Sequence, residues 1–163
     1  MKKSAGILLY RFNNKVVEFL LVHPGGPFWR NKDEGAWSIP KGEFEEEEKA
    51  LQTAIREFEE ELGTPVSGTF TELMPVKQLG GKTIYAWALQ GDLDVNKFRS
   101  NSFETEWPPR SGIKQKFPEV DKAAWFDAST AIDKINPAQA GFIKEMVKAL
   151  KKSTAANQAA LRR

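Results

Sequence analysis

The sequence predicts an α/β domain in which a mixed central sheet packs with one early helix and one C-terminal helix. Its β-rich runs at residues 4–12, 16–22 and 83–89 do not alternate regularly with helices, which argues against a doubly wound parallel sheet. Amphipathic helical patterns occur in only two places, early and near the C-terminus. The 163 residues suffice for one domain with a sizeable core and are too few for two.

The first half of the chain begins with a hairpin pattern, because Asn13-Asn14-Lys15 joins the first two β-rich runs. The Gly- and Pro-rich segment 23–35 is expected to form a loop, and Trp37-Ser38-Ile39 a short strand that ends at Pro40. A helix is expected over residues 48–62. Its apolar stripe consists of Leu51, Ala54, Ile55, Phe58 and Leu62. Gly63 is then placed to act as a C-cap.

The second half predicts strands over residues 69–79 and 83–89, with a turn at 80–82, and a last strand over 123–126. Residues 91–118 contain three prolines and are expected to form a long functional or mobile loop. A second amphipathic helix follows Asn136-Pro137. We therefore expect one domain over residues 1–150 and a flexible tail over 151–163.

Composition excludes several kinds of site. Without cysteine, the chain has no disulfide, thiolate zinc site or cysteine nucleophile, and its single histidine excludes a multi-histidine metal site. No apolar run approaches the roughly 20 residues that span a bilayer. No signal-peptide pattern follows the basic start, so the expected location is cytoplasmic and no membrane partner is expected.

Charge is distributed unevenly. Between Gly42 and Glu61, nine glutamates face only Lys49 and Arg56, which gives a local charge of −7 in a chain of net charge +2. This acidic segment is either a solvated helix face or a centre for divalent cations. Glu57, Glu60 and Glu61 fall at i, i+3 and i+4 of the predicted helix and share one face, where their charges repel. A hard dication such as Mg²⁺ would relieve that repulsion, whereas the alternative is a solubilising face.

The segment GEFEEEEKALQTAIREFEEELGT, which starts at Gly42, places its glycines and charges at a specific spacing. Five residues separate Gly42 from Glu48, seven more precede Arg56-Glu57, and Glu60-Glu61 comes two residues before Gly63. This pattern resembles the signature of the Nudix hydrolases, and the preceding segment WSIPKG agrees with it. Thr64 and Glu47 depart from the family pattern, but neither position is a metal ligand in it.

The resemblance implies a Nudix-type α/β/α sandwich over about residues 4–150. It also implies that Glu57, Glu60 and Glu61 hold Mg²⁺, with Mn²⁺ as a substitute, and that a backbone carbonyl near Lys41–Gly42 adds a ligand. Glu48 and Arg56 are expected to pair, which would keep Arg56 from neutralising the metal carboxylates. Either Glu60 or Glu61 could act as general base. Glu119 is either a further acidic ligand and candidate base or a surface carboxylate.

Substrate contacts are expected from cations and flat rings. Lys41, Gly42 and Arg110 are the main candidates for the phosphates, and Tyr85 and Trp107 for a nucleobase. Further candidates are Arg30, Lys32, Lys82, Lys114, Lys116, Trp29 and Phe103. His23 is either a substrate contact or a hydrogen-bonded structural residue.

The resemblance implies a Mg²⁺-dependent hydrolase that cleaves a diphosphate linkage in a small nucleotide. The layout around AGILLYR, WSIPKG and KTIYAWAL is similar to the diadenosine tetraphosphate hydrolases, whereas the loops HPGGPFW and EWPPRSG resemble a bacterial Nudix subgroup. Dinucleoside polyphosphates are therefore one substrate class among several. The alternatives are a non-catalytic nucleotide-binding regulator and an enzyme acting on capped RNA ends. General nucleic-acid binding is not expected, since no recognised motif is present. Many family members are homodimers, so a homodimer is a further expectation.

Overall fold

The computed structural model describes residues 2–45 and 48–161, so Glu47 lies outside the described residues. Among these residues, seven strands form one mixed sheet. Its long strands are β1 (Lys3–Asn13), β2 (Val16–Pro24), β6 (Thr83–Gln90) and β9 (Val120–Asp127), and its short strands are β3 (Lys41–Phe44), β4 (Thr71–Glu72) and β5 (Val76–Lys77). The order is β4-β6-β1-β2-β9, with β3 beside β1 and β5 beside β6. The sheet is mixed because β1 runs parallel to β6 and antiparallel to β2 and β3.

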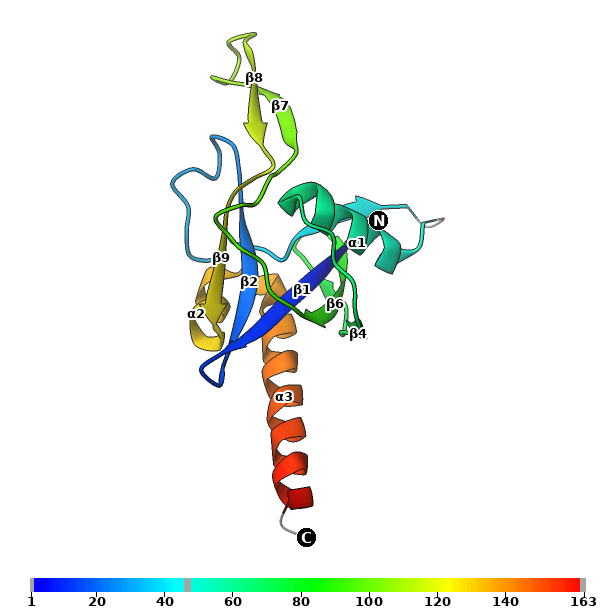
Figure 1. The fold of residues 1–163 in the computed structure, drawn as a ribbon. Helices are drawn as coiled ribbons and strands as arrows, with labels where there is room; N and C mark the ends of the chain where they lie inside the picture. Colours follow the sequence, from blue (N-terminus) through cyan, green and yellow to red (C-terminus); the bar gives the residue numbers. More distant parts are fainter. Residues whose placement is uncertain (1, 46–47, 162–163) are drawn as a thin grey trace.

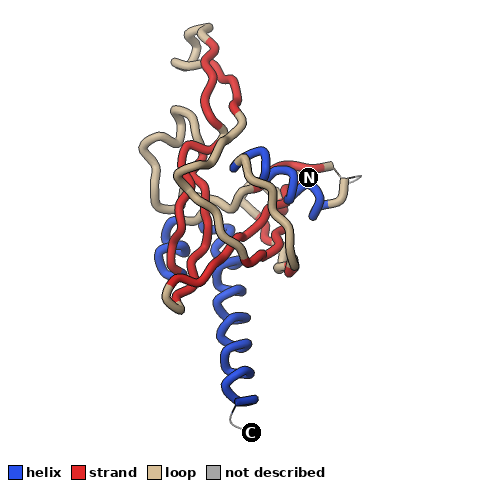
Figure 2. Tube along the Cα trace, viewed as in Figure 1, coloured by secondary structure: helices blue, strands red, loops and turns tan. Residues whose placement is uncertain are grey.

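Helices cover both faces of this sheet (Figure 2). Helix α1 (Ala50–Leu62) packs on one face, and α2 (Ala128–Lys134) and α3 (Ala140–Leu161) pack on the other. Alternation along β1 supplies both cores, because Ile7 and Leu9 join Phe58 of α1 while Leu8 joins Phe142 of α3. The predicted α/β/α sandwich with a mixed sheet is confirmed.

Two predicted strands differ from the structure. Residues 37–39 form no named strand, and only isolated bridges join Trp37 and Ser38 to their neighbours. The strand lies instead at β3, just after them, where Lys41 and Gly42 pair with Gly6 and Ala5 of β1. The run predicted over 69–79 is divided into β4 and β5, which lie on either side of Pro75. Proline cannot donate to a ladder, which is a physical reason for the interruption.

The long loop predicted over 91–118 contains a separate hairpin of β7 (Ser102–Glu106) and β8 (Lys114–Pro118). Figure 1 shows this hairpin standing away from the main sheet, at the end of the molecule opposite the projecting part of α3. The flexibility expected of the tail from residue 151 stays a prediction. Helix α3 continues to Leu161, although its side chains over 151–159 are all exposed. No helix in the described part of the chain is long and apolar enough to cross a membrane.

Candidate active site

The last turn of α1 is held by backbone hydrogen bonds from the segment before β7. The N–H groups of Arg99 and Asn101 donate to the carbonyls of Leu62 and Glu60, both at 3.1 Å. These bonds satisfy carbonyls that a helix end leaves without partners. The N–H of Glu119 in turn donates to the carbonyl of Asn101 at 2.7 Å. One short segment therefore connects the acidic helix to Glu119, although the two are distant in sequence.

The acidic face of α1 opens onto a cavity of about 350 Å³, which we call the carboxylate cavity. Its lining residues are Lys41, Gly42, Glu43, Glu57, Glu60, Glu61, Asn101 and Glu119. The four predicted metal-ligating glutamates thus line the same cavity as the turn at Lys41–Gly42. Glu43 and Asn101 were not predicted. Asn101 has no motif in the sequence, and its position depends on the pairing with α1 and Glu119.

Gly42 has a steric role in this cavity. A Cβ atom at this position would lie 2.0 Å from Cδ of Glu57 and 2.3 Å from its Oε1. The Glu57 carboxyl group therefore lies against the backbone of β3, in space that any other residue would fill. This contact explains why glycine stands 15 positions before that glutamate.

Burial and like charges alter the acidity of the cavity. Burial, together with the charges of Glu57 and Glu119, raises the pKa of Glu61 to about 8, although Lys41 opposes this through its charge and its backbone N–H. Burial and Glu60 also raise the pKa of Glu57 above its usual value. The pKa of Lys41 is lowered by burial and by Lys82. Without a cation, the cavity therefore favours a protonated Glu61.

Arg56 contacts several of the motif carboxylates. Its Nη2 atom lies 3.6 Å from Glu48 Oε2, so the expected pair is present with a long contact. Its Nη1 atom also lies 3.2 Å from Oε1 of both Glu57 and Glu60. This differs from the expectation that Glu48 would keep Arg56 from the metal carboxylates. In this structure the guanidinium group partly neutralises two of them.

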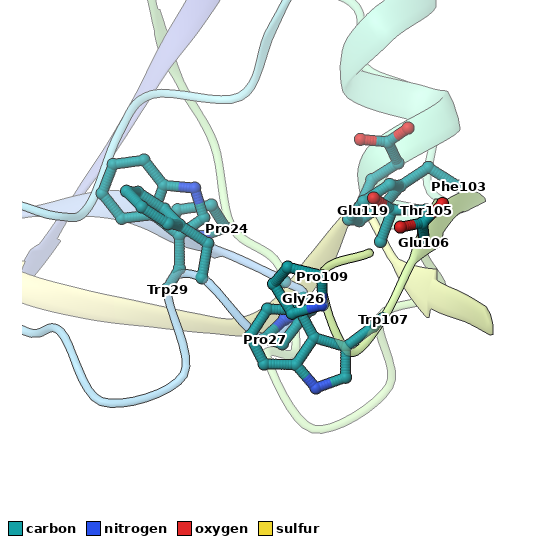
Figure 3. A pocket seen from close by; sticks show the side chains of 12 residues that line it. Pro24, Gly26, Pro27, Trp29, Phe103, Thr105, Glu106, Trp107, Pro109 and Glu119 are labelled. Atoms are coloured by element: carbon teal, nitrogen blue, oxygen red, sulfur yellow. The ribbon is translucent and has the colours of Figure 1, made fainter. Parts of the chain in front are cut away.

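Two further cavities adjoin the carboxylate cavity and also contain Glu119. The lysine cavity, of about 250 Å³, is lined by both Lys41 and Lys82. The hairpin pocket, of about 370 Å³, lies between the 24–29 loop and the β7–β8 hairpin and contains Trp107 (Figure 3). A region that contains two lysines and a mostly apolar region thus both adjoin the acidic centre.

Three other sequence candidates lie elsewhere. The ring of Tyr85 packs edge-on against Phe44, with centroids 5.9 Å apart, and lines none of these three cavities. Arg110 is exposed at the hairpin turn, with a φ of 62°, and does not line them either. His23 is buried, with Nδ1 2.8 Å from Asp121 Oδ1 and Nε2 2.6 Å from the carbonyl oxygen of Lys32. These contacts give His23 a structural role.

The family model of the NUDIX domain matches residues 1–146. The chain belongs to the NUDIX domain family. The asymmetrical bis(5'-nucleosyl)-tetraphosphatase of Sus scrofa is 31% identical to this chain over 106 residues, which cover 57% of this chain and 68% of the pig protein. The predicted family is confirmed, and with it the predicted class of Nudix pyrophosphohydrolase.

Solved structures agree on the Nudix fold. An Ap4A hydrolase of C. elegans in a binary complex superposes with a TM-score of 0.60 at 22% identity, covering 94% of this chain and 99% of that chain. The NUDIX domain of Shewanella oneidensis NrtR complexed with ADP ribose gives a TM-score of 0.59 at 16% identity, covering 91% and 87%. At these identities the similarity shows the fold alone.

The carboxylate cavity of this Nudix domain suits a divalent cation, because its glutamates offer the hard oxygen donors that Mg²⁺ prefers. Within residues 2–45 and 48–161, no three acidic or histidine side chains already form a metal cage. Glu57 and Glu60 point to Arg56 instead. Both side chains already line the cavity, so cation binding would replace their contacts with Arg56.

Proposed function

We propose that this chain is a Mg²⁺-dependent hydrolase that cleaves a diphosphate linkage in a nucleoside polyphosphate, or in a nucleoside diphosphate joined to another group. The observation that carries the proposal is the grouping of Glu57, Glu60, Glu61 and Glu119 around one cavity beside Lys41. The pig relative, named as an asymmetrical tetraphosphatase, supports dinucleoside polyphosphates such as diadenosine tetraphosphate as one substrate class.

Glu57, Glu60 and Glu61 would hold the cation, with Glu119 of the same cavity as a further ligand. A bound Mg²⁺ polarises a phosphoryl oxygen and lowers the pKa of water, which is the chemistry that these carboxylates alone do not supply. Gly42 contributes by leaving room for the Glu57 carboxyl group against β3. Arg56 lies beside this set and offsets part of its negative charge when the glutamates hold no cation, and Glu48 contacts the other amino group of Arg56.

The general base is expected among the same glutamates. Glu61 is one candidate, because it lines both the carboxylate cavity and the lysine cavity, where the phosphates are expected. Glu60 and Glu119 line the same cavity and remain the alternatives.

The phosphates are expected to extend into the lysine cavity, where Lys41 and Lys82 both form part of the lining. Cations at this place would offset phosphate charge next to the cleaved bond. Lys82 now pairs with Glu43 at 3.2 Å and would exchange this exposed contact for a phosphate. Arg110 remains a proposal for the distal phosphates, because it lies on the hairpin turn.

The test is a substrate panel assayed with Mg²⁺, with Mn²⁺ and with EDTA. It contains diadenosine tetraphosphate, nucleoside triphosphates, ADP-ribose, a nucleotide sugar and capped RNA. We expect Mg²⁺-dependent cleavage of a diphosphate bond in at least one compound. Glu60→Gln and Glu61→Gln should each lower turnover by orders of magnitude, because each removes the charge of a proposed Mg²⁺ ligand. The fold should stay intact, because each substitution also removes like-charge repulsion on the helix.

The matched control is Glu59→Gln, since Glu59 is an exposed neighbour on α1 that does not line the carboxylate cavity. Its turnover should equal that of the wild type. Wild-type turnover in both cavity variants would refute the proposed role of the glutamates. Nucleotide binding without turnover of any compound would instead favour the non-catalytic regulator.

A further inference from the structure

We propose that the hairpin pocket binds the base of the nucleotide substrate and selects purines. The inference rests on the proposed function, because it takes the occupant to be part of the same nucleotide that is cleaved. The pocket lies between the 24–29 loop and the β7–β8 hairpin, and its volume of about 370 Å³ falls within the range of small-molecule sites.

The walls of the pocket are mostly apolar and flat. They are formed by Pro24, Gly25, Gly26, Pro27, Phe28, Trp29, Phe103, Trp107 and Pro109. Figure 3 shows Trp29 on one side of the pocket, Phe103 on the other, and Trp107 with Pro109 between them. Flat aromatic walls favour a planar ligand, and the larger ring system of a purine gains more contact than a pyrimidine.

The hairpin supplies this wall through strand alternation. Phe103, Thr105 and Trp107 alternate with two glutamates along the strand and its end, and all three line the pocket. Phe103 also fixes the distance between hairpin and loop, because a Cβ atom on Gly26 would lie 2.8 Å from its Cζ. The hairpin is therefore packed against the loop by close contact at this point.

The position of the pocket indicates which part of the substrate it takes. Glu119 lines both the pocket and the carboxylate cavity, so the two spaces lie next to each other at this residue. No lysine or arginine of the described residues lines the pocket, whereas Lys41 and Lys82 line the cavity beyond Glu119. The mostly apolar lining of the hairpin pocket thus suits the uncharged base better than the polyphosphate, whereas the neighbouring cavity offers two ammonium groups beside its glutamates.

The polar groups of the pocket agree with a base that carries N–H donors. Apart from Thr105 and the indole N–H donors of Trp29 and Trp107, its polar groups are two carboxylates. Glu106 and Glu119 accept hydrogen bonds when ionised and cannot donate them. Guanine, adenine and cytosine all present amino groups that such acceptors bind, so the selection of purines over pyrimidines rests on their larger ring area. The rings of Trp29 and Phe28 already make cation–π contacts with the ammonium group of Lys32, which lies 5.0 Å and 3.6 Å from their centroids. Trp107 is therefore the ring chosen for the test.

The experiment measures binding of GMP, AMP, CMP, UMP and tripolyphosphate to the full chain with Mg²⁺ by calorimetry. We expect both purine nucleotides to bind more tightly than CMP and UMP. Trp107→Ala should weaken GMP and AMP binding about tenfold or more, and tripolyphosphate binding should not change. Trp107→Phe should restore most of the affinity, since it retains a flat ring.

Two matched controls come from the same hairpin. Ile113 lies beside Trp107 in the hairpin, where its backbone carbonyl accepts a hydrogen bond from the backbone N–H of Trp107 at 2.8 Å. Ile113 does not line the pocket. Ile113→Ala should therefore bind like the wild type. Glu104 and Glu106 are both exposed on β7, and only Glu106 lines the pocket. Glu106→Gln should reduce purine affinity, and Glu104→Gln should not.

The outcomes separate this inference from the proposed function. Equal binding of purines and pyrimidines, or unchanged purine affinity in Trp107→Ala, would overturn the inference even if the chain hydrolyses nucleotides. Selective, Trp107-dependent purine binding without hydrolysis of any compound would support the pocket and refute the enzymatic proposal. Equal losses of GMP and tripolyphosphate binding in Trp107→Ala would also overturn it, because the ring would then act on the whole site.

Discussion

At Gly42 the missing side chain leaves space for the carboxyl group of Glu57, a proposed Mg²⁺ ligand, which makes Gly42 a sharp test of the site. In Gly42→Ala the new methyl group must displace the end of the Glu57 side chain, which a Cβ atom would approach to 2.0 Å. That side chain is flexible, so we expect the free energy of unfolding to change by only about 1 kcal/mol or less. Mg²⁺-dependent turnover should fall at least about tenfold, because the cation loses a positioned ligand. Chemical denaturation and steady-state kinetics measure the two effects.

Gly141→Ala is the matched control, because a Cβ atom at Gly141 would meet only Val76 Cγ1 at an ordinary 3.8 Å. It lies in α3, where alanine is favoured over glycine, so the protein should become slightly more stable with unchanged turnover. If Gly42→Ala retains full turnover, the close packing of Glu57 on β3 has no catalytic value.

The sequence predicts those site residues that lie close together within a single helix or strand. Glu57, Glu60 and Glu61 share a helix face by periodicity alone, so the motif predicted them. Asn101 reaches the same cavity only through its tertiary hydrogen bonds to α1 and Glu119, which no local pattern specifies. Tyr85 was predicted as a base contact because its ring is flat and aromatic. In the structure this ring packs against Phe44 instead.

At the scale of elements, the end of α1 is coupled to the loop that holds Glu119. Gly63 has a φ of 73°, and a Cβ atom there would also lie 3.0 Å from Cβ of Arg99. We expect Gly63→Ala to destabilise the fold by about 1–2 kcal/mol, through left-handed strain and this contact. It should also weaken Mg²⁺ binding, because Arg99 and Asn101 position Glu119. Thermal unfolding and Mg²⁺ titration test both effects.

Gly80→Ala separates the effect of left-handed backbone strain from the effect of the contact with Arg99. Gly80 has a φ of 92°, and a Cβ atom at this position would meet nothing within 4 Å, so its substitution adds backbone strain alone. Its destabilisation should be smaller than that of Gly63→Ala, with unchanged Mg²⁺ binding. Equal effects of the two substitutions on Mg²⁺ binding would contradict the coupling through Arg99.

The elements that the sequence missed had weak or competing signals. The β7–β8 hairpin alternates apolar and charged residues, with Phe103 and Phe117 paired across the strands and Glu104 opposite Lys116. This period of two was present in the sequence, but the prolines and the length of the segment favoured a loop. Helix α3 continues to Leu161 because its last part is rich in alanine, a strong helix former even without an apolar face. Helices with a clear apolar stripe, such as α1, were predictable because burial and propensity agree.

For the whole molecule, the buried carboxyl groups link stability to pH and to Mg²⁺. The pKa of Glu61 rises from 4.5 to about 8 on folding, and that of Glu57 also rises. Between these pH values the folded state binds more protons than the unfolded state, so the free energy of unfolding must fall as pH increases. The lowered pKa of Lys41 has the opposite effect on stability. It makes the free energy of unfolding rise with pH in the range just below the ordinary lysine value of 10.5.

We therefore expect the metal-free protein to lose stability, on the order of a few kcal/mol, between about pH 5 and pH 8 in EDTA. Excess Mg²⁺ should stabilise the protein more at pH 8 than at pH 5, because it binds the ionised carboxylates of the folded state. Glu61→Gln should flatten the profile in EDTA, whereas Glu59→Gln should preserve it, and urea denaturation across this range measures both. A wild-type profile in Glu61→Gln would show that proton uptake at the carboxylate cavity does not control stability. The loss of stability in EDTA would then have to come from other titrating groups.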